Sequence, residues 1–361
     1  MKITQIIGLV LVLGAVLLLT WFRSYSEKKE AVLPPVTVRG YVGGEKMGLV
    51  QNPKIQKILL EKYRVTLRPE KRGSVEMVIS EPLEGIDFVW PGSQVQLEMY
   101  RQQNKPMVAS EILFNSPIVI YSWDLVEAAL SRSGIVEKEN QTYYVVKMPD
   151  LIQVVTEKKK WKEMGVPELF GSVKVACTDP LKSNSGNQFV CLTAIVLVGG
   201  ETLQQEDLPK VVPTLKNFLK SLGYLHSSSG DFFNQYLKQG MGAYPLAAGY
   251  ENQIIEFSLQ NREFLKSIQS KLRILYPRPT VWSSHPMIAV NAQGKRLLVA
   301  MQDPQIQAIA WEEHGFRTGN ASITLNAQKL GIPGIPDNIT SIVSMPSAQV
   351  VEQLIQQTKP Q

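Results

Sequence analysis

A continuous apolar stretch near the amino terminus constrains this chain most. From Ile6 to Phe22 the residues are apolar apart from Thr20, and the three residues before Ile6 extend the stretch to about the length that crosses a bilayer. Trp21 and Phe22 follow where a small-x-small cleavage site would stand, and aromatic side chains favour the membrane interface. We therefore predict that residues 1–23 form an uncleaved membrane anchor rather than a cleaved signal peptide.

The charges that flank this stretch leave its orientation open. Lys2 stands on one side and Arg23 on the other, while the two lysines further along are offset by glutamates. Cys177 and Cys191 are the only cysteines, and a disulfide between them would suit an oxidising compartment. Two separately buried thiols are the alternative, so the disulfide is a hypothesis.

Composition predicts a folded chain with one or two cores. Of its 361 residues 44% are apolar and 19% are charged, which is not a disordered composition. The net charge of +6 comes from scattered basic residues, and the densest run, residues 158–162, is typical of a solvated helix face. Because no arginine-rich stripe or aromatic cluster accompanies these residues, we predict no nucleic-acid binding.

We predict that residues 24–35, which are polar and end in two prolines, form a short stalk, and that a two-lobed body follows it. The predicted parts of the body are lobe I (first part) at 36–118, lobe II at 119–249, the return part of lobe I at 250–345, and a C-terminal tail at 346–361. Short β-branched runs alternate with helical patterns, which favours a parallel sheet with helices on its faces.

Individual elements of this body are predicted from the same patterns. In the first half we expect strands at Val36–Tyr41, Val65–Pro69, Ile86–Trp90 and Ser116–Ser122, and helices at Pro53–Tyr63, Ser74–Ile79 and Leu125–Ser131. In the second half we expect strands at Ser172–Cys177 and Ala248–Ser258, a final strand after the proline-rich residues 276–290, and helices at Ser185–Leu197, Leu208–Leu222, Asp231–Lys238 and Asp303–His314.

Two motifs carry a resemblance to a known family. Residues 178–186, TDPLKSNSG, resemble the turn that opens a ligand-facing helix in type 2 periplasmic solute-binding proteins, especially the branch of molybdate, sulfate and phosphate receptors. Residues 303–317, DPQIQAIAWEEHGFR, are similar to the terminal helix of that family. The resemblance extends from about Val36 to Met345. It implies an α/β, two-lobed fold of the type 2 periplasmic-binding-protein class. Together with the N-terminal transmembrane helix predicted from the apolar stretch, it predicts a single-pass cell-membrane protein whose ectodomain lies on the extracytoplasmic side.

The first motif also has a physical interpretation that needs no family. Ser183, Asn184 and Ser185 are preferred N-cap residues, Gly186 permits close backbone approach, and an apolar helix follows them. The free amides and positive dipole end of that helix would face the preceding loop. The alternative is an ordinary capped helix.

Three first-lobe loops lie where predicted strands end, which is where open α/β sheets bind ligands. They are Gly43–Lys46, Arg72–Ser74 and Trp90–Gln94, and the family resemblance adds the pair at positions 250 and 251. The predicted ligand-binding residues are Gly44, Glu45, Lys46, Arg72, Gly73, Ser74, Gly92, Ser93, Gln94, Ser183, Asn184, Ser185, Gly186, Tyr250 and Glu251. If Glu45, Glu76 and Glu251 pointed inward they would oppose an anion, so a zwitterionic or cationic solute stays an alternative to an oxyanion.

No enzyme is predicted. His226, His285 and His314 are the only histidines and are far apart in the sequence, and no catalytic or metal-binding motif occurs, so no cofactor is expected either. We predict a membrane-tethered protein that clasps a small, anionic solute between two lobes for a transporter permease or a membrane sensor. The alternative is a ligand-free scaffold or sensor domain that binds a membrane protein partner; an extracytoplasmic enzyme is less favoured.

Overall fold

The structure is a computed structural model that describes residues 34–223, 225–319 and 323–359. The predicted anchor, residues 1–23, and all but the last two residues of the predicted stalk lie outside these ranges. Within the described ranges, no helix combines the length and the apolar character that crossing a membrane requires.

The elements of the first part of the chain alternate between short strands and helices. They are β1 (Val36–Val42), η1 (Gly44–Lys46), α2 (Met47–Gln51), α3 (Pro53–Tyr63), β2 (Val65–Lys71), α4 (Ser74–Ile79), β3 (Phe88–Trp90), α5 (Gln94–Gln102), β4 (Ala109–Trp123), α6 (Asp124–Arg132), β5 (Val136–Glu139), β6 (Thr142–Val145), α7 (Met148–Thr156) and η2 (Trp161–Met164).

Helices predominate in the rest of the chain. The elements are α8 (Asn184–Leu197), η3 (Gln205–Asp207), α9 (Leu208–Leu222), α10 (Ser229–Ala243), β7 (Ala247–Tyr250), α11 (Glu251–Gln260), α12 (Arg262–Ile268), β8 (Leu272–Pro277), β9 (Trp282–Ala289), α13 (Ala292–Met301), α14 (Pro304–His314), η4 (Ala327–Leu330) and α15 (Ala348–Thr358).

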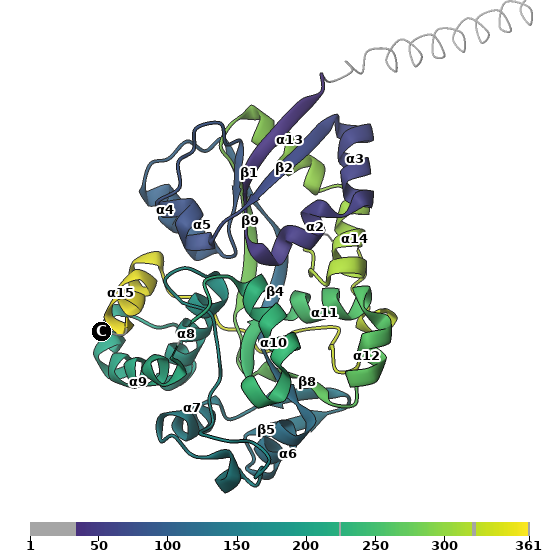
Figure 1. Ribbon diagram of the computed structural model, residues 1–361. Helices are drawn as coiled ribbons and strands as arrows, with labels where there is room; N and C mark the ends of the chain where they lie inside the picture. Colours follow the sequence, from purple (N-terminus) through teal and green to yellow (C-terminus); the bar gives the residue numbers. More distant parts are fainter. Residues whose placement is uncertain (1–33, 224, 320–322, 360–361) are drawn as a thin grey trace, which may run out of the picture. The chain divides into compact units, whose positions relative to one another are not determined.

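The described strands form a sheet in the order β2-β1-β3-β9-β4-β8-β6-β5. Strand β7 pairs with β4 on the edge opposite β8, because Ile120 and Tyr121 of β4 have a partner in each of these strands. The 15-residue strand β4 joins the two halves of the sheet. The amino-terminal part of β4 pairs with β9 through Pro117, and its carboxyl-terminal part pairs with β7 and β8 from Ile118 to Trp123. We call the half with β1, β2, β3 and β9 the first lobe and the half with β5, β6, β7 and β8 the second lobe (Figure 1).

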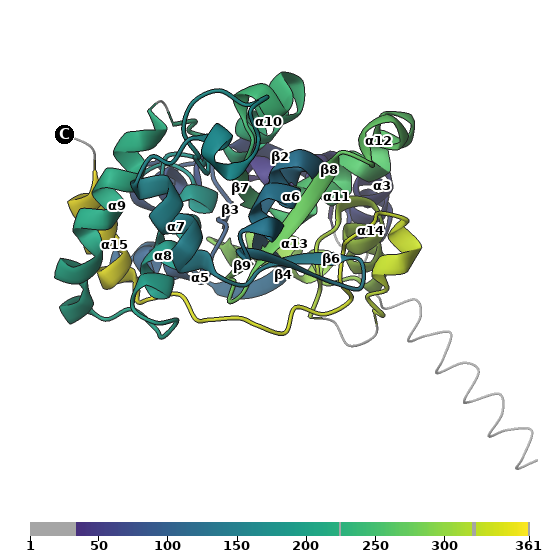
Figure 2. The same cartoon turned by 90° about the horizontal axis from the view of Figure 1, so that it is seen from below.

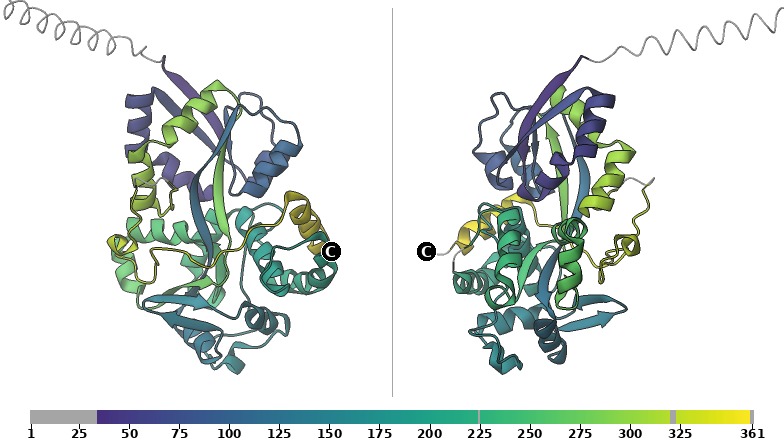
Figure 3. Two further views of the ribbon diagram at one scale, coloured as in Figure 1. Left: turned by 180° about the vertical axis from the view of Figure 1, so that it is seen from behind. Right: turned by 45° about the vertical axis from the view of Figure 1, so that its right-hand side comes forward.

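Helices cover the sheet in both lobes. In the first lobe α3 packs on β2 and α13 on β9, and in the second lobe α8 packs on β7 and α6 on β4. A continuous hydrophobic core runs through both lobes, and strand β4 contributes Ile118, Val119 and Ile120, none of which is exposed. The views in Figure 3 show β4 and β9 side by side, crossing between the lobes.

The C-terminal segment contacts both lobes. After α14 it runs past β4 and β9 to α15, as Figures 2 and 3 show in yellow. Helix α15 packs on α8 and α9 of the second lobe and on α5 of the first lobe, where the Ala348 amide donates a 2.9 Å hydrogen bond to Glu98 Oε2. The C-terminal tail thus contains a helix, α15, that was not predicted from the sequence.

Strong capping signals explain the bounds of two correctly predicted helices, α3 and α14. Asn52 accepts hydrogen bonds from the amides of Lys54 and Ile55, Pro53 occupies the first helical position, and Arg64 ends α3 in the left-handed region with φ 55°. Helix α14 begins after Asp303, whose side chain accepts the amide hydrogen of Gln305, and it ends at Gly315 in the left-handed region. Both helices start and end within one residue of their predicted positions.

The prediction of a parallel sheet is wrong for most strand pairs. Strands β1 and β3 pair in parallel, as do β6 and β8, whereas β4 runs antiparallel to β7, β8 and β9. The physical reason is the long crossing strand β4, beside which the chain returns in the opposite direction.

Two predicted strands are also wrong. Residues 172–177 form only isolated bridges and no strand. The segment predicted as a strand at Ala248–Ser258 is strand β7 to Tyr250 and then helix α11. The final strand, β9, lies inside the proline-rich residues 276–290 rather than after them. Lys158 and Lys159 are exposed as expected, but Lys158 lies in a turn after α7 and Lys159 in the loop that follows it, so neither is on a helix.

The disulfide hypothesis is wrong as well. Cys177 and Cys191 are both free and both buried in the core, Cys191 within helix α8. Burial raises the pKa of each thiol to about 12.

Candidate functional site

A pocket of about 280 Å³ lies between the two lobes. First-lobe residues from the ends of β1 and β2 form one side, and residues that begin α8 and α10 in the second lobe form the other. The lining residues are Gly43, Gly44, Glu45, Lys71, Arg72, Gly73, Ser74, Glu76, Lys182, Ser183, Asn184, Ser227, Ser228, Ser229 and Asp231.

The first-lobe side is built from loops at one edge of the sheet. Strands β1 and β3 are parallel and in register at Val42 and Trp90, so the loops that follow them leave the sheet at the same edge. Gly92, in the loop after β3, donates its amide hydrogen to Ser74 Oγ at 3.1 Å, and Ser283 on β9 donates to the Gly92 carbonyl at 2.5 Å. These bonds hold the loops after β2 and β3 together beside the pocket.

The second-lobe side is the start of α8. The Asp179 carbonyl accepts the amide hydrogens of Lys182 and Ser183, and this turn brings Ser183 to the N-cap position. Ser183 makes no side-chain capping bond to the first-turn amides of α8. Because Ser183 and Asn184 line the pocket, the first turn of α8 and the positive end of its dipole lie beside the pocket. An arrangement of this kind favours an acceptor or an anion on the solute.

Asn184 joins the second lobe to the first. Its Nδ2 donates to Tyr250 Oη at 2.9 Å and to Ser283 Oγ at 3.3 Å, and a Cβ added at Gly92 would lie 2.6 Å from the same nitrogen. Position 92 therefore accepts only glycine while Asn184 is seated there.

Two further contacts cross between the lobes at α10. Lys71 Nζ lies 2.9 Å from a carboxylate oxygen of Asp231, and Ser229 Oγ donates to Glu45 Oε2 at 3.4 Å. The Lys71 pair is solvent-exposed and contributes little stability, whereas the Glu45 contact is buried.

A buried charged cluster lies directly beneath the pocket. Lys46 Nζ contacts Glu45 Oε1 and lies 3.1 Å from His285 Nδ1, and His285 has no exposed surface. Burial lowers the pKa of Lys46, and burial together with the Lys46 charge lowers the pKa of His285 to about 4. Burial alone would raise the pKa of Glu45, but Lys46 and His285 lower it below the ordinary range. Glu45 is therefore an internal carboxylate whose charge is already balanced.

The structure brings about half of the predicted site residues into this one pocket. They are Gly44, Glu45, Arg72, Gly73, Ser74, Ser183 and Asn184. Lys46 lies beneath it, and Ser185 and Gly186 are buried in the first turn of α8. Ser93 and Gln94 line a separate pocket of about 220 Å³ beside the C-terminal segment.

Tyr250 and Glu251 do not line the pocket. Tyr250 accepts the hydrogen bond from Asn184 and so supports a pocket residue from behind. Glu251 is fully buried and paired with Arg317 and Tyr276, so its partners come from the protein itself.

No residue at the start of α10 was among the predicted ligand-binding residues. Ser227, Ser228, Ser229 and Asp231 line the pocket, and Ser228 is the N-cap whose Oγ accepts the amide hydrogen of Asp231. The run Ser-Ser-Ser-Gly-Asp was a readable N-cap signal. Lys71 and Lys182 carried no such signal, because lysine is common on any surface.

The comparisons define the class of fold. No protein-family model matches the chain, and no curated protein sequence matches it. Solved structures match it over nearly its whole length, and the fold is the mixed α/β fold of two-lobed periplasmic and extracellular solute-binding proteins.

Three of these structures show the extent of the likeness. A periplasmic thiamin binding protein is 11% identical, with a TM-score of 0.61 over 90% of this chain and 96% of its own. The ferric binding protein from Campylobacter jejuni is 12% identical, with a TM-score of 0.59 over 89% and 96%. The sulfate-binding protein SubI from Mycobacterium tuberculosis is 12% identical, with a TM-score of 0.54 over the same shares. At such identities the likeness establishes the fold.

Proposed function

We propose that this chain is a solute-binding protein that holds a small solute in the pocket between its lobes. The observation that carries the proposal is the pocket itself, because loops at the sheet edge of one lobe and two helix starts of the other lobe line the same pocket. The fold shared with proteins named for binding sulfate, thiamin and ferric ion supports a binding role over a catalytic one.

The lining chemistry favours a small solute with negative charge. Lys182 lines the pocket together with the start of α8 and has no ion-pair partner among the described residues. The other charged lining residues except Glu76 are already paired: Lys71 with Asp231, Arg72 with Glu70 and Glu81, and Glu45 with Lys46. Glu76 has no ion-pair partner among the described residues. An anion is therefore our first proposal, and a zwitterion that could meet Glu76 is the second.

We also propose that the protein is tethered to the cell membrane and faces the extracytoplasmic side, where it would serve a transporter permease or a sensor. This proposal rests on the apolar stretch from Ile6 to Phe22 and its aromatic end. Protease protection of the full chain in sealed membrane vesicles tests it, and digestion of the body from the cytoplasmic face would contradict it.

Ligand-dependent stability tests the binding proposal. The full-length protein is screened by thermal denaturation with molybdate, sulfate, phosphate, tellurite and amino acids. A solute at 100 times its dissociation constant should stabilise the native state by about 2.7 kcal/mol, a clear rise in melting temperature.

A double variant links any response to the pocket. Ser183→Ala with Ser185→Ala should remove the rise, because it removes hydroxyl groups at the start of α8. Ser80→Ala with Ser267→Ala, two exposed serines, is the matched control and should retain it. If no solute raises the melting temperature and the double variant behaves like the control, the binding proposal is wrong.

The alternative function is a scaffold or sensor domain that binds a membrane protein partner. The contacts across the lobes favour it, because Asn184, Glu45 and Asp231 already engage protein groups on the opposite lobe, and α15 packs on both lobes. A scaffold should show no solute response yet should bind its membrane partner with an affinity that pocket variants do not change.

A further inference from the structure

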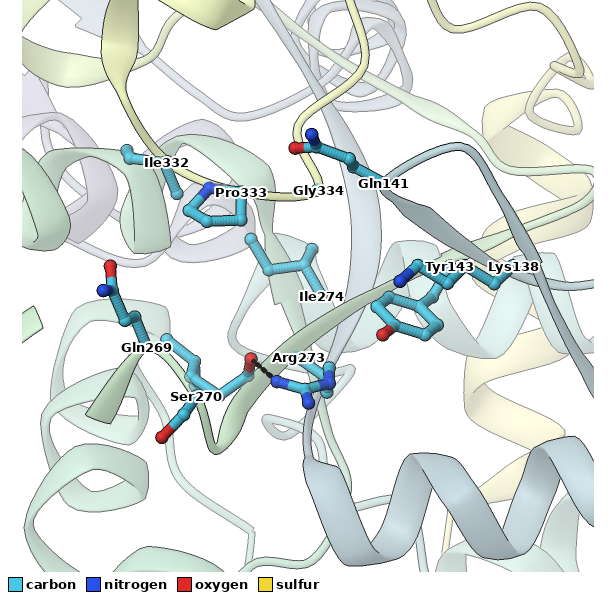
Figure 4. A pocket seen from close by; sticks show the side chains of 11 residues that line it. Lys138, Gln141, Tyr143, Gln269, Ser270, Arg273, Ile274, Ile332, Pro333 and Gly334 are labelled. Carbon is cyan, nitrogen blue, oxygen red and sulfur yellow. Dashed lines mark hydrogen bonds between the residues drawn. The ribbon is translucent and has the colours of Figure 1, made fainter. Parts of the chain in front are cut away.

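A second pocket lies entirely within the second lobe and the C-terminal segment that covers it. Its volume is about 410 Å³, and it shares no lining residue with the pocket between the lobes. The β5–β6 hairpin, the start of β8 and residues 332–334 form its walls (Figure 4). The lining residues are Lys138, Gln141, Tyr143, Gln269, Ser270, Leu272, Arg273, Ile274, Ile332, Pro333 and Gly334.

Apolar groups form the walls of this pocket. Ile274 on β8 and Ile332 are 5% and 8% exposed, and Leu272 and Pro333 complete the apolar surface. Figure 4 shows Tyr143 on one side, Pro333 on the other, and Ile274 between them. Because strands β6 and β8 are paired in register at Tyr143, these walls are held by the sheet.

The charges at the pocket all have one sign. Lys138 and Arg273 are the charged residues of the lining, and both lie over the Tyr143 ring, at 5.2 Å and 5.6 Å from its centre. Lys138 has no ion-pair partner within the described ranges. A ligand in this pocket therefore meets two cations and no lining carboxylate.

The guanidinium of Arg273 retains donors for a ligand. Its Nη1 donates to the Leu272 carbonyl at 2.9 Å, while the buried Nε lies 3.6 Å from Glu127 Oε2 and makes no hydrogen bond with any described residue. Nη2 likewise has no hydrogen-bond acceptor among the described residues. Guanidinium donors prefer a carboxylate, and they bind it more strongly where apolar groups exclude water.

We propose that this pocket binds a small amphiphilic carboxylate. The apolar body would pack against Ile274, Ile332 and Pro333, and the carboxylate would lie between Lys138 and Arg273 beside Tyr143. A pocket of this size accommodates a drug-sized molecule. Aromatic acids and medium-chain fatty acids share this chemistry. The proposal is independent of the function proposed for the pocket between the lobes.

Direct binding measurements on the full-length protein test this site. The probes are 1-naphthoate as the aromatic acid and octanoate as the aliphatic acid, each compared with its neutral alcohol, and octylammonium as the cation. Saturation-transfer NMR and calorimetry should show both or one of the acids binding more tightly than its alcohol, and octylammonium binding least. The acid that binds more tightly identifies the ligand source.

Variants connect the binding to the pocket. Lys138→Gln should weaken acid binding about two- to fivefold, the range of an exposed ion pair, and Arg273→Gln should weaken it about tenfold or more because this charge is partly buried. Ser270→Trp places a large side chain at the pocket and should abolish binding. Lys174→Gln is the matched control, since Lys174 is exposed and lies outside the pocket.

Two outcomes would overturn the proposal. Acids that bind no more tightly than their alcohols, or binding that survives Ser270→Trp, would show that this pocket is not a carboxylate site. Thermal denaturation checks that each variant folds. If Ser270→Trp does not fold, Gln269→Trp, at an exposed lining position, takes its place with the same expected loss.

Discussion

The guanidinium of Arg317 donates two hydrogen bonds to the carboxylate of Glu251, from Nε at 2.6 Å and from Nη2 at 2.8 Å. Both side chains are buried, and Tyr276 Oη donates a third bond to the same carboxylate at 2.7 Å. Arg317 also donates to the carbonyls of Pro336 and Asp337. The pair thus fastens the segment after α14 to the start of α11 and to the C-terminal chain.

Loss of this arginine should be costly. Arg317→Ala leaves the Glu251 carboxylate buried with only Tyr276, and removing one partner of a buried ion pair lowers the free energy of unfolding by about 3–5 kcal/mol. Denaturation with urea measures the loss. Arg278→Ala is the control, because it removes a similar two-bond pair with Glu139 at the exposed edge of the second lobe, and equal losses would refute the assignment.

Stability should fall in mild acid because of His285. Burial and the neighbouring Lys46 charge lower its pKa to about 4, whereas the unfolded chain has the ordinary value of 6.5. The unfolded state therefore binds a proton first as the pH falls below 6.5, and the loss is complete near the folded pKa. Over this window the free energy of unfolding should decrease by up to about 3 kcal/mol.

Urea denaturation at several pH values between 7 and 4 tests this dependence. His285→Gln keeps an acceptor for Lys46 without a titrating ring, so its stability should vary less over the same window. An identical slope in the variant would assign the effect to other groups, of which His226 also has a pKa lowered by burial.

Glycine 186 should be irreplaceable at the start of α8. A Cβ there would lie 2.0 Å from the Thr178 carbonyl oxygen, a backbone atom that cannot move aside cheaply. Gly186→Ala should therefore lower the free energy of unfolding by about 1–3 kcal/mol, the usual cost of overpacking. Gly242→Ala in α10 is the control, since nothing lies within 4 Å of the added carbon, and it should cause no loss.

The two thiols should be inert in the native protein. Burial raises the pKa of Cys177 and Cys191 to about 12, so almost no thiolate exists at neutral pH. A thiol reagent should label neither cysteine in the native state and both after unfolding without reductant. Intact mass two units lower than the reduced chain would instead reveal a disulfide.

Local signals predicted much of the framework. The caps at Asn52 and Asp303 placed α3 and α14, and the Ser-Asn-Ser-Gly run placed the start of α8 at the pocket. The segment Ala248–Ser258 was predicted as one strand, but strand β7 ends at Tyr250 and helix α11 begins at the next residue. A short apolar run fits either a strand or a helix, so its pattern could not separate the two.

The sequence by itself determined which segments could cap a helix, turn at a sheet edge or carry a charge, because those properties depend on neighbouring residues. Tertiary structure alone decided which charges meet. The sequence predicted Glu251 as a ligand-binding residue, but its carboxylate is paired with Arg317, which lies 66 positions away. Asp231 forms its ion pair with Lys71 of the other lobe. Pairings between distant segments depend on how the chain packs, and no local pattern encodes that geometry.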